Sequence, residues 1–167
     1  MGVNVMKNQK GFSLIELLIV VAIILIIAAI AIPNLLQARA AANESSAVGS
    51  VRTINVAEVV YQSTFPDVGF ANQLSDLGTA GTVPCISGPA SACLIDNALE
   101  TGAKGGYNFT ATGSNGLPNV QYFATGTPNG SSGNRSFCGI EDGVVRVDPT
   151  GALAGSYGAC AALNSLQ

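Results

Sequence analysis

Residues 12–32 read FSLIELLIVVAIILIIAAIAI, an apolar run of 21 residues that only Ser13 and Glu16 interrupt. As an α-helix this run would be about 32 Å long, which matches the roughly 30 Å hydrocarbon core of a bilayer. It shows no polar face, unlike a core helix of a soluble protein. Lys7 and Lys10 precede the run, so the positive-inside rule places the N-terminus in the cytoplasm and the later residues outside. The sequence therefore predicts a membrane-spanning helix.

Glu16 lies near the start of this run, where a carboxylate is costly. Acidic groups at the centre of a membrane helix cost roughly 2.5–3.5 kcal/mol on insertion scales, and such residues are by default functional and paired with a cation. The run itself contains no cation. Cleavage just before Phe12 would create one, because the new α-amino group would lie about one helical turn from Glu16, or beside Glu16 of a neighbouring chain.

Three other interpretations of the run need no paired Glu16. One is a plain signal anchor, and a second is an anchor for an exported binding domain or enzyme. The third is a secretory signal peptide cleaved at the A-x-A site Ala29–Ala31, although the apolar core of a signal peptide is about 7–15 residues long. The chain contains no His, which removes Ser-His and Cys-His nucleophile pairs and every His-containing metal site. We therefore predict no catalytic residue and no cofactor.

The same residues resemble the N-terminus of a type IV prepilin. The shared features are a basic leader, Gly at the cleavage point, an aromatic first mature residue, Glu fifth in the mature chain, and Pro at the end of the apolar run: Gly11, Phe12, Glu16 and Pro33. The resemblance implies cleavage after Gly11 by a prepilin peptidase, N-methylation of Phe12, and pairing of Glu16 with the Phe12 amine of a neighbouring subunit. Leu25 stands where many relatives carry Gly, which predicts a stiffer middle of the helix.

The resemblance also implies a non-enzymatic, structural function. Residues 1–11 would be a cytoplasmic leader, and the prepilin would sit in the inner membrane with its head outside the cytoplasm. After cleavage, the subunit would polymerise through residues 12–32 on a pilus assembly platform. It would leave the cell through a secretin as an extracellular filament for adhesion, motility or DNA uptake. A pseudopilin of a type II secretion system is the alternative.

A helix that is apolar on all sides needs other copies of itself once it leaves the lipid. Burying about 19 apolar side chains at ~1.5 kcal/mol or more each gives tens of kcal/mol of gross driving force against water. Apolar contacts slide, however, and do not define a register. A carboxylate–ammonium pair in a low dielectric does, because an unpaired charge there costs several kcal/mol. Glu16 is therefore the predicted register determinant.

Helical spacing continues beyond Pro33, over residues 33–63. A proline inside a helix removes one hydrogen bond and kinks it. An apolar series, into which Glu58 intrudes, falls on one side of this segment: Ala40, Ala47, Val51, Ile54 and Tyr61. We expect an amphipathic continuation, packed partly against the head and partly against neighbouring subunits. Two helices broken at Pro33 are the alternative.

Residues 64–167 have the composition of a turn-rich head, with 17 of the 20 Gly and 6 of the 7 Pro. After a connection that begins at Phe65–Pro66, alternating runs are separated by turn signals at Asn115–Gly116, Asn129–Gly130 and Asp142–Gly143. The sequence predicts an α+β, pilin-like fold in which the long helix packs on a four-stranded antiparallel meander. The expected strands are residues 107–112, 120–125, 135–140 and 144–147.

The four cysteines lie on the predicted exported side of the membrane, where an even number indicates two disulfides with three possible pairings. Short loops close most easily, which favours Cys85–Cys93 and Cys138–Cys160. The second pair is also similar to a disulfide that the pilin family often has near its C-terminus. A zinc site is disfavoured because Cys85 and Cys93 lack the close C-x₂₋₄-C spacing.

The charged residues bear on two possible partners, nucleic acid and calcium. The net charge of −3 and the sequence pI of about 4.7 argue against a nucleic-acid partner, because few cations are available to neutralise phosphates. Glu141, Asp142 and Asp148 lie close in sequence, and some pilin relatives hold calcium near the C-terminus. A solvated turn is the simpler interpretation of these three residues.

Overall fold

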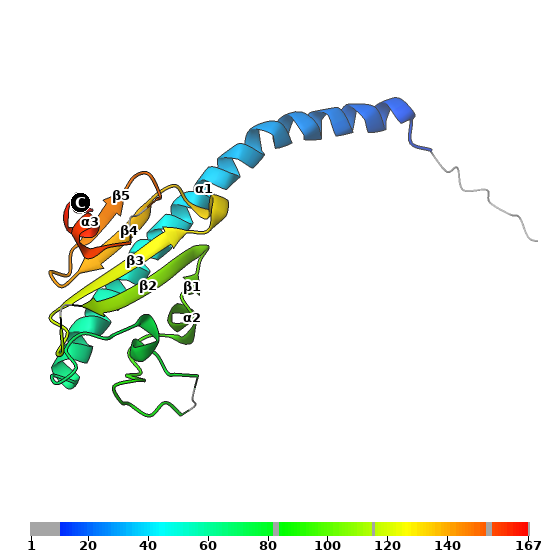
Figure 1. Cartoon of the computed structure of the whole chain (residues 1–167). Coiled ribbons are helices and arrows are strands. Elements are labelled where there is room, and N and C mark those ends of the chain that lie inside the picture. Colours follow the sequence, from blue (N-terminus) through cyan, green and yellow to red (C-terminus); the bar gives the residue numbers. More distant parts are fainter. Residues whose placement is uncertain (1–10, 82–83, 115, 153–154, 167) are drawn as a thin grey trace, which may run out of the picture. The chain divides into compact units, whose positions relative to one another are not determined.

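The computed structural model describes residues 11–81, 84–114, 116–152 and 155–166 (Figure 1). Residues 1–10 of the predicted leader, and Asn115 of a predicted turn, lie outside the described residues. The chain divides into one unit that ends at Ala38 and a second that begins at Arg39. In chain order the elements are α1 (Leu14–Thr64), η1 (Leu74–Leu77), α2 (Asn97–Glu100), β1 (Ala103–Lys104), β2 (Tyr107–Ser114), β3 (Gln121–Pro128), η2 (Gly130–Ser132), β4 (Ser136–Ile140), β5 (Val145–Asp148) and α3 (Tyr157–Ala161).

The predicted long helix is confirmed as α1, which runs for 51 residues. Pro33 lies inside it, so the alternative of two helices broken at this proline is wrong. A proline removes one backbone hydrogen bond and its ring crowds the carbonyl one turn earlier, which bends a helix but need not end it. The Leu-, Gln- and Ala-rich sequence that follows favours helix and lets α1 continue.

From Arg39 onward α1 has one buried face. Its buried residues recur every three or four positions, which places them on one side of the helix. They include Ala47, Val51, Ile54 and Tyr61 of the predicted apolar series. The full set is Glu44, Ala47, Ser50, Val51, Ile54, Asn55, Ala57, Glu58 and Tyr61.

The second unit contains a five-stranded antiparallel sheet in the order β1-β2-β3-β4-β5, one strand more than predicted. The additional strand is β1, which pairs Ala103 with Asn108 and Lys104 with Tyr107 of β2. A two-residue strand carries no alternating pattern, so the sequence did not predict it. The sequence did contain one sign of the hairpin between β1 and β2, namely the pair Gly105–Gly106. Both have positive φ, 60° and 78°, as the central residues of a type I′ hairpin require.

The predicted turn at Asp142–Gly143 joins β4 to β5. Gly143 has a φ of 71° and donates its N–H to the Ile140 carbonyl at 2.9 Å. Asn129 and Gly130 lie between β3 and β4, but the chain there forms the short 3₁₀ helix η2 instead of a tight two-residue turn.

The sheet is covered by α1 on one face, and β4 is covered on the other face as well. One face contributes Tyr107, Phe109, Tyr122 and Phe137 to the main core together with α1. On the other face a smaller cluster joins β4 to α3 through Cys138, Ile140 and Cys160. All five residues of β4 are buried, because consecutive side chains of this strand point alternately to the two covered faces. The core of the head therefore lies between the sheet and the second part of α1 (Figure 1).

Candidate assembly site and its supporting head

The first part of α1 exposes its apolar side chains. Its most apolar 18-residue window has a mean hydropathy of 3.3, and none of that window is buried. The large apolar side chains of residues 12–32 are between 46% and 82% exposed, from Val21 to Phe12. By length and composition, α1 is the one helix in the described part of the chain that is long and apolar enough to cross a membrane.

Glu16 lies in the first turn of α1 and caps its own helix. Its Oε2 accepts a hydrogen bond from the Ser13 N–H at 2.8 Å. Ser13 directly precedes the first helical residue, Leu14, so Ser13 and Glu16 occupy the first and last positions of an S-x-x-E capping box. The sequence contained this pattern, but it was not predicted. The hydrogen bond lowers the cost of the carboxylate at the helix end without supplying a positive charge.

No cation is paired with Glu16 among the residues that the structure describes. The ion pairs described all lie in the second unit, and they join Lys104 to Asp96, Arg135 to Glu44, and Arg146 to Asp142. Gly11 and Phe12 precede the helix and are exposed. The predicted cleavage point and the predicted register carboxylate therefore lie within one short exposed segment.

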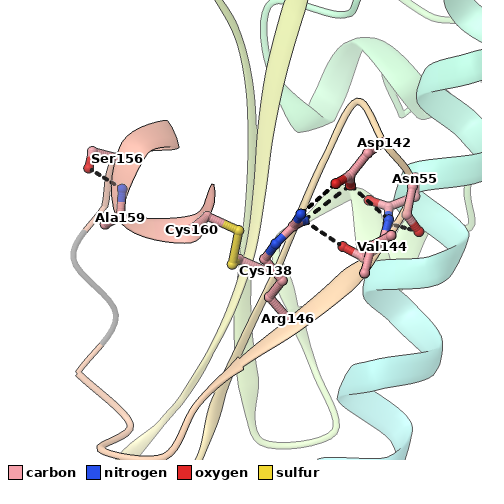
Figure 2. Close-up of a disulfide and its surroundings, with 9 residues drawn as sticks. Asn55, Cys138, Asp142, Val144, Arg146, Ser156, Ala159 and Cys160 are labelled. Carbon is pink, nitrogen blue, oxygen red and sulfur yellow. Dashed lines mark hydrogen bonds and ion pairs between the residues drawn. A yellow bond between two sulfur atoms is a disulfide. The ribbon is translucent and has the colours of Figure 1, made fainter. Parts of the chain in front are cut away.

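The four cysteines pair as Cys85–Cys93 and Cys138–Cys160, with Cα–Cα distances of 6.2 and 6.1 Å. The first disulfide closes a loop in which Gly88 and Ser91 form an antiparallel bridge. The second ties α3 to the buried strand β4, as Figure 2 shows. Each disulfide therefore restrains a segment with little core of its own.

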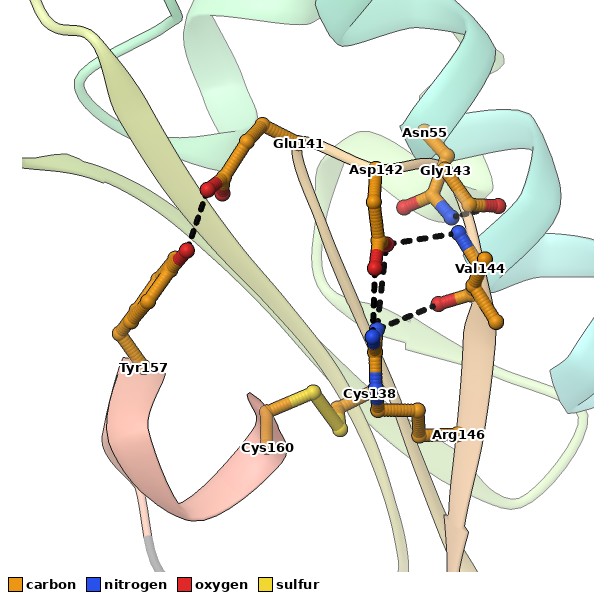
Figure 3. A network of polar contacts seen from close by, with 9 residues as sticks. All are labelled: Asn55, Cys138, Glu141, Asp142, Gly143, Val144, Arg146, Tyr157 and Cys160. Atoms are coloured by element: carbon orange, nitrogen blue, oxygen red, sulfur yellow. Dashed lines mark hydrogen bonds and ion pairs between the residues drawn. A yellow bond between two sulfur atoms is a disulfide. The ribbon is translucent and has the colours of Figure 1, made fainter. Parts of the chain in front are cut away.

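The turn between β4 and β5 is held by a polar network (Figure 3). The Asp142 carboxylate accepts hydrogen bonds from the Val144 N–H at 2.9 Å and from Arg146 Nη1 at 3.1 Å. The hydrogen bond from Arg146 is the main reason why the pKa of Asp142 is lowered. Asn55 of α1 donates from Nδ2 to the Gly143 carbonyl at 3.2 Å, which fastens the turn to the helix.

The three acidic residues considered for calcium are not brought together. Glu141 accepts a hydrogen bond from the Tyr157 hydroxyl of α3 (Figure 3), Asp142 binds Arg146, and Asp148 binds Thr150. Asp142 lies in the turn, whereas Asp148 pairs with Ser136 at the opposite end of the hairpin. No cluster of three or more metal-ligating side chains occurs in the part of the chain described.

A second polar contact, between Glu44 and the β3–β4 connection, fastens α1 to the head. The Glu44 carboxylate accepts hydrogen bonds from the Asn134 N–H at 2.9 Å and from Arg135 Nε at 2.8 Å, and Arg135 Nη2 lies 2.7 Å away. Burial by itself would raise the pKa of Glu44, but the hydrogen bonds from Asn134 and Arg135 outweigh it and lower the pKa. This clamp joins residues 91 positions apart, so no local pattern could predict it.

The N-terminal residues match a known sequence family. The family described as the prokaryotic N-terminal methylation motif matches residues 6–32, which include Gly11, Phe12 and Glu16. No solved structure matches the chain.

Curated relatives are named as pilus proteins. The chain is 68% identical over 40 residues to the type IV wide pilus major component PilA4 of Thermus thermophilus, covering 24% of this chain and 30% of that protein. It is 36% identical over 98 residues to the type IV major pilin protein PilA of Myxococcus xanthus, covering 56% and 44%. It is 39% identical over 102 residues to a fimbrial protein of Pseudomonas aeruginosa, covering 55% and 63%. The chain thus spans less than two-thirds of the length of each relative.

The matched methylation motif lies at the start of a long helix, and the later part of the same helix packs on an antiparallel sheet. The chain is therefore similar to named pilin and fimbrial proteins, most strongly over its N-terminal residues.

Proposed function

We propose that this chain is a structural subunit of a type IV pilus, cleaved after Gly11 by a prepilin peptidase and polymerised through residues 12–32. The observation that carries the proposal is the exposure of the apolar part of α1, with a single carboxylate near its tip. Exposed apolar surface of this extent is stable only in lipid or against other apolar helices. A subunit that moves from the membrane into a filament uses both environments in turn.

Glu16 sets the register of the filament in this proposal. Cleavage after Gly11 frees the α-amine of Phe12, which stays positively charged when a methyl group is then transferred to it, and Glu16 of a neighbouring subunit is its partner. The Ser13 N–H already holds the carboxylate at the helix start at 2.8 Å, so its orientation costs little further entropy. In a low-dielectric core, a charge that loses its partner costs several kcal/mol. The filament is therefore most stable in the register that keeps Glu16 paired.

The head also offers a surface to neighbouring subunits. On the side of α1 away from the sheet, Val56, Val59 and Val60 are 66%, 53% and 40% exposed. Grooves of about 420 and 330 Å³ lie on this surface, and Arg52, Val56 and Val60 line both of them. Among the described residues Arg52 forms no ion pair. Helices of neighbouring subunits would cover these valines in a filament.

The proposed function is not enzymatic, and its partners follow from the assembly route. Before assembly, the chain sits in the inner membrane with its head outside the cytoplasm. The prepilin peptidase, the pilus assembly platform and the secretin act on it in succession. The product is an extracellular filament that serves adhesion, motility or DNA uptake.

Mass spectrometry of the mature chain tests the processing step. The mature protein should begin at methylated Phe12. A start after Ala31, or an uncut chain, would overturn the proposal.

Electron microscopy of the cell surface tests the pilus function. Surface filaments should contain the chain and should disappear when its gene is deleted. Correct processing without surface filaments, combined with a secretion defect on deletion, would instead identify a pseudopilin of a type II secretion system.

A further inference from the structure

Glu58 is a fully buried carboxyl group on the face of α1 that packs on the head. Its Oε2 accepts one hydrogen bond, from the Ala71 N–H at 2.9 Å. Its Oε1 is buried and has no hydrogen-bond partner among the described residues. A carboxylate normally accepts several hydrogen bonds or pairs with a cation when it is buried, so Glu58 is poorly suited to carry a charge.

The titratable groups near Glu58 are an acid and two tyrosines, and none of them is a cation. Asp76 of η1 is a second buried acid, and its Oδ1 accepts a hydrogen bond from Gln73 Nε2 at 3.0 Å. Tyr61 of α1 and Tyr122 of β3 are the other titratable neighbours, and the Tyr122 hydroxyl is buried without a partner in the described structure. Burial, opposed by the Ala71 N–H and reinforced by Asp76, raises the pKa of Glu58 to about 7.

The hydrogen bond of Glu58 joins α1 to the segment that connects α1 to the sheet, and Asn119 holds the same segment through the Phe70 N–H and carbonyl. Phe70, next to Ala71, packs at a tilted angle against Tyr122 with a ring-centroid distance of 4.8 Å. Further along the same segment, the Asp76 carbonyl accepts from the Ala92 N–H at 2.8 Å and the Leu77 carbonyl accepts from the Leu94 N–H at 2.8 Å. The disulfide-bonded loop is therefore fastened through residues 70–77, and also directly to α1, because the Tyr61 hydroxyl donates to the Pro89 carbonyl at 2.6 Å.

We propose that Glu58 is a proton-linked latch, whose neutral form holds residues 70–77 against α1 and whose ionisation loosens this segment together with the disulfide-bonded loop. The pairing of β3 with β4 does not depend on Glu58 and stays intact. Ionisation would place an unpaired charge in the core, and local opening of the segment would admit water to it. The latch concerns the head alone and does not require that the chain forms a filament.

Hydrogen exchange of the full chain in detergent micelles tests the proposal, with rates corrected for the intrinsic effect of pH. Between about pH 5.5 and pH 8.5, protection of residues 65–78 should fall by about tenfold to thirtyfold relative to β3. Glu58→Gln keeps an acceptor for the Ala71 N–H but cannot ionise, so its protection should not change with pH. Glu44→Gln, at an ion-paired acid, should retain the pH dependence of the wild type.

Equal pH dependence in the wild type and in Glu58→Gln would overturn the latch, as would a loss of protection spread evenly over β3 and the segment. Infrared spectroscopy of the wild type gives a test that needs no variant. A carboxylic-acid band should persist to about neutral pH, well above the usual carboxyl range. Absence of such a band at about pH 6 would also overturn the proposal.

Discussion

The two parts of α1 treat their carboxylates in opposite ways. Up to Ala38 no residue of the helix is buried, and the single acid, Glu16, lies at its start with only the Ser13 N–H bound to it. From Arg39 onward one face is buried, and that face includes two acids, Glu44 and Glu58. Glu44 meets an arginine within its own chain. Glu44 thus has a cationic partner within the chain, whereas Glu16 has none among the described residues.

The largest effect is expected from Glu16→Ala. The variant should be processed but should fail to enter filaments, because the neighbouring amine would be left unpaired in a low-dielectric core, at a cost of several kcal/mol. Filament yield by shearing and immunoblot, beside the mass of the processed chain, measures both steps.

Glu16→Gln separates the charge from the helix cap. Its amide oxygen can still accept from the Ser13 N–H, but it cannot pair with an ammonium group. We expect this variant to fail in assembly as well. Normal filaments from Glu16→Gln would mean that capping, and not charge, is the function of this residue.

Loss of the Cys138–Cys160 disulfide should give the next largest effect, and it concerns the head alone. For loops of 22 and 8 residues, chain entropy predicts a destabilisation of about 3 kcal/mol for Cys138→Ser with Cys160→Ser and about 2.5 kcal/mol for the other pair. Denaturant unfolding of the full chain in detergent measures both. A larger loss from the Cys85–Cys93 pair would contradict this ranking.

Glu44→Gln should destabilise the head by about 2 kcal/mol, because it weakens the contact with Arg135 while leaving an acceptor for the Asn134 N–H. Since the pKa of Glu44 is lowered, its contribution is present above the usual carboxyl pKa and is lost as the pH falls through the lowered value. Unfolding measured over an acidic pH series should therefore converge for the variant and the wild type. Asp96→Asn, at the exposed pair with Lys104, is the control and should cost less than about 1 kcal/mol.

The sequence predicted the apolar part of α1 more completely than it predicted the head. The apolar part of α1 is defined by composition and local spacing, so its length, its exposure and its acid were accessible without a structure. The capping box at Ser13 and Glu16 was equally local and was overlooked. In the head, the sequence predicted the strands that are long enough to show alternating apolar and polar residues. It missed β1, because a strand of two residues shows no such alternation.

The polar contacts of the head could not be predicted. Glu44 meets Arg135 across 91 residues, and Asn55 meets the Gly143 carbonyl across 88. Such contacts depend on the register of the sheet against the helix, for which no local pattern exists. Glu58 stood out as an acid in an apolar series, but its partner, a backbone N–H, has no signature in the sequence.

A high-resolution structure of the assembled filament tests the central claim most directly, through the distance between the Phe12 amine of one subunit and the Glu16 carboxylate of the next. Our account predicts an ion pair within about 4 Å, in the range of salt bridges, repeated along the filament. A filament in which Glu16 binds only its own Ser13 N–H, with no amine of a neighbouring subunit near it, would contradict the account.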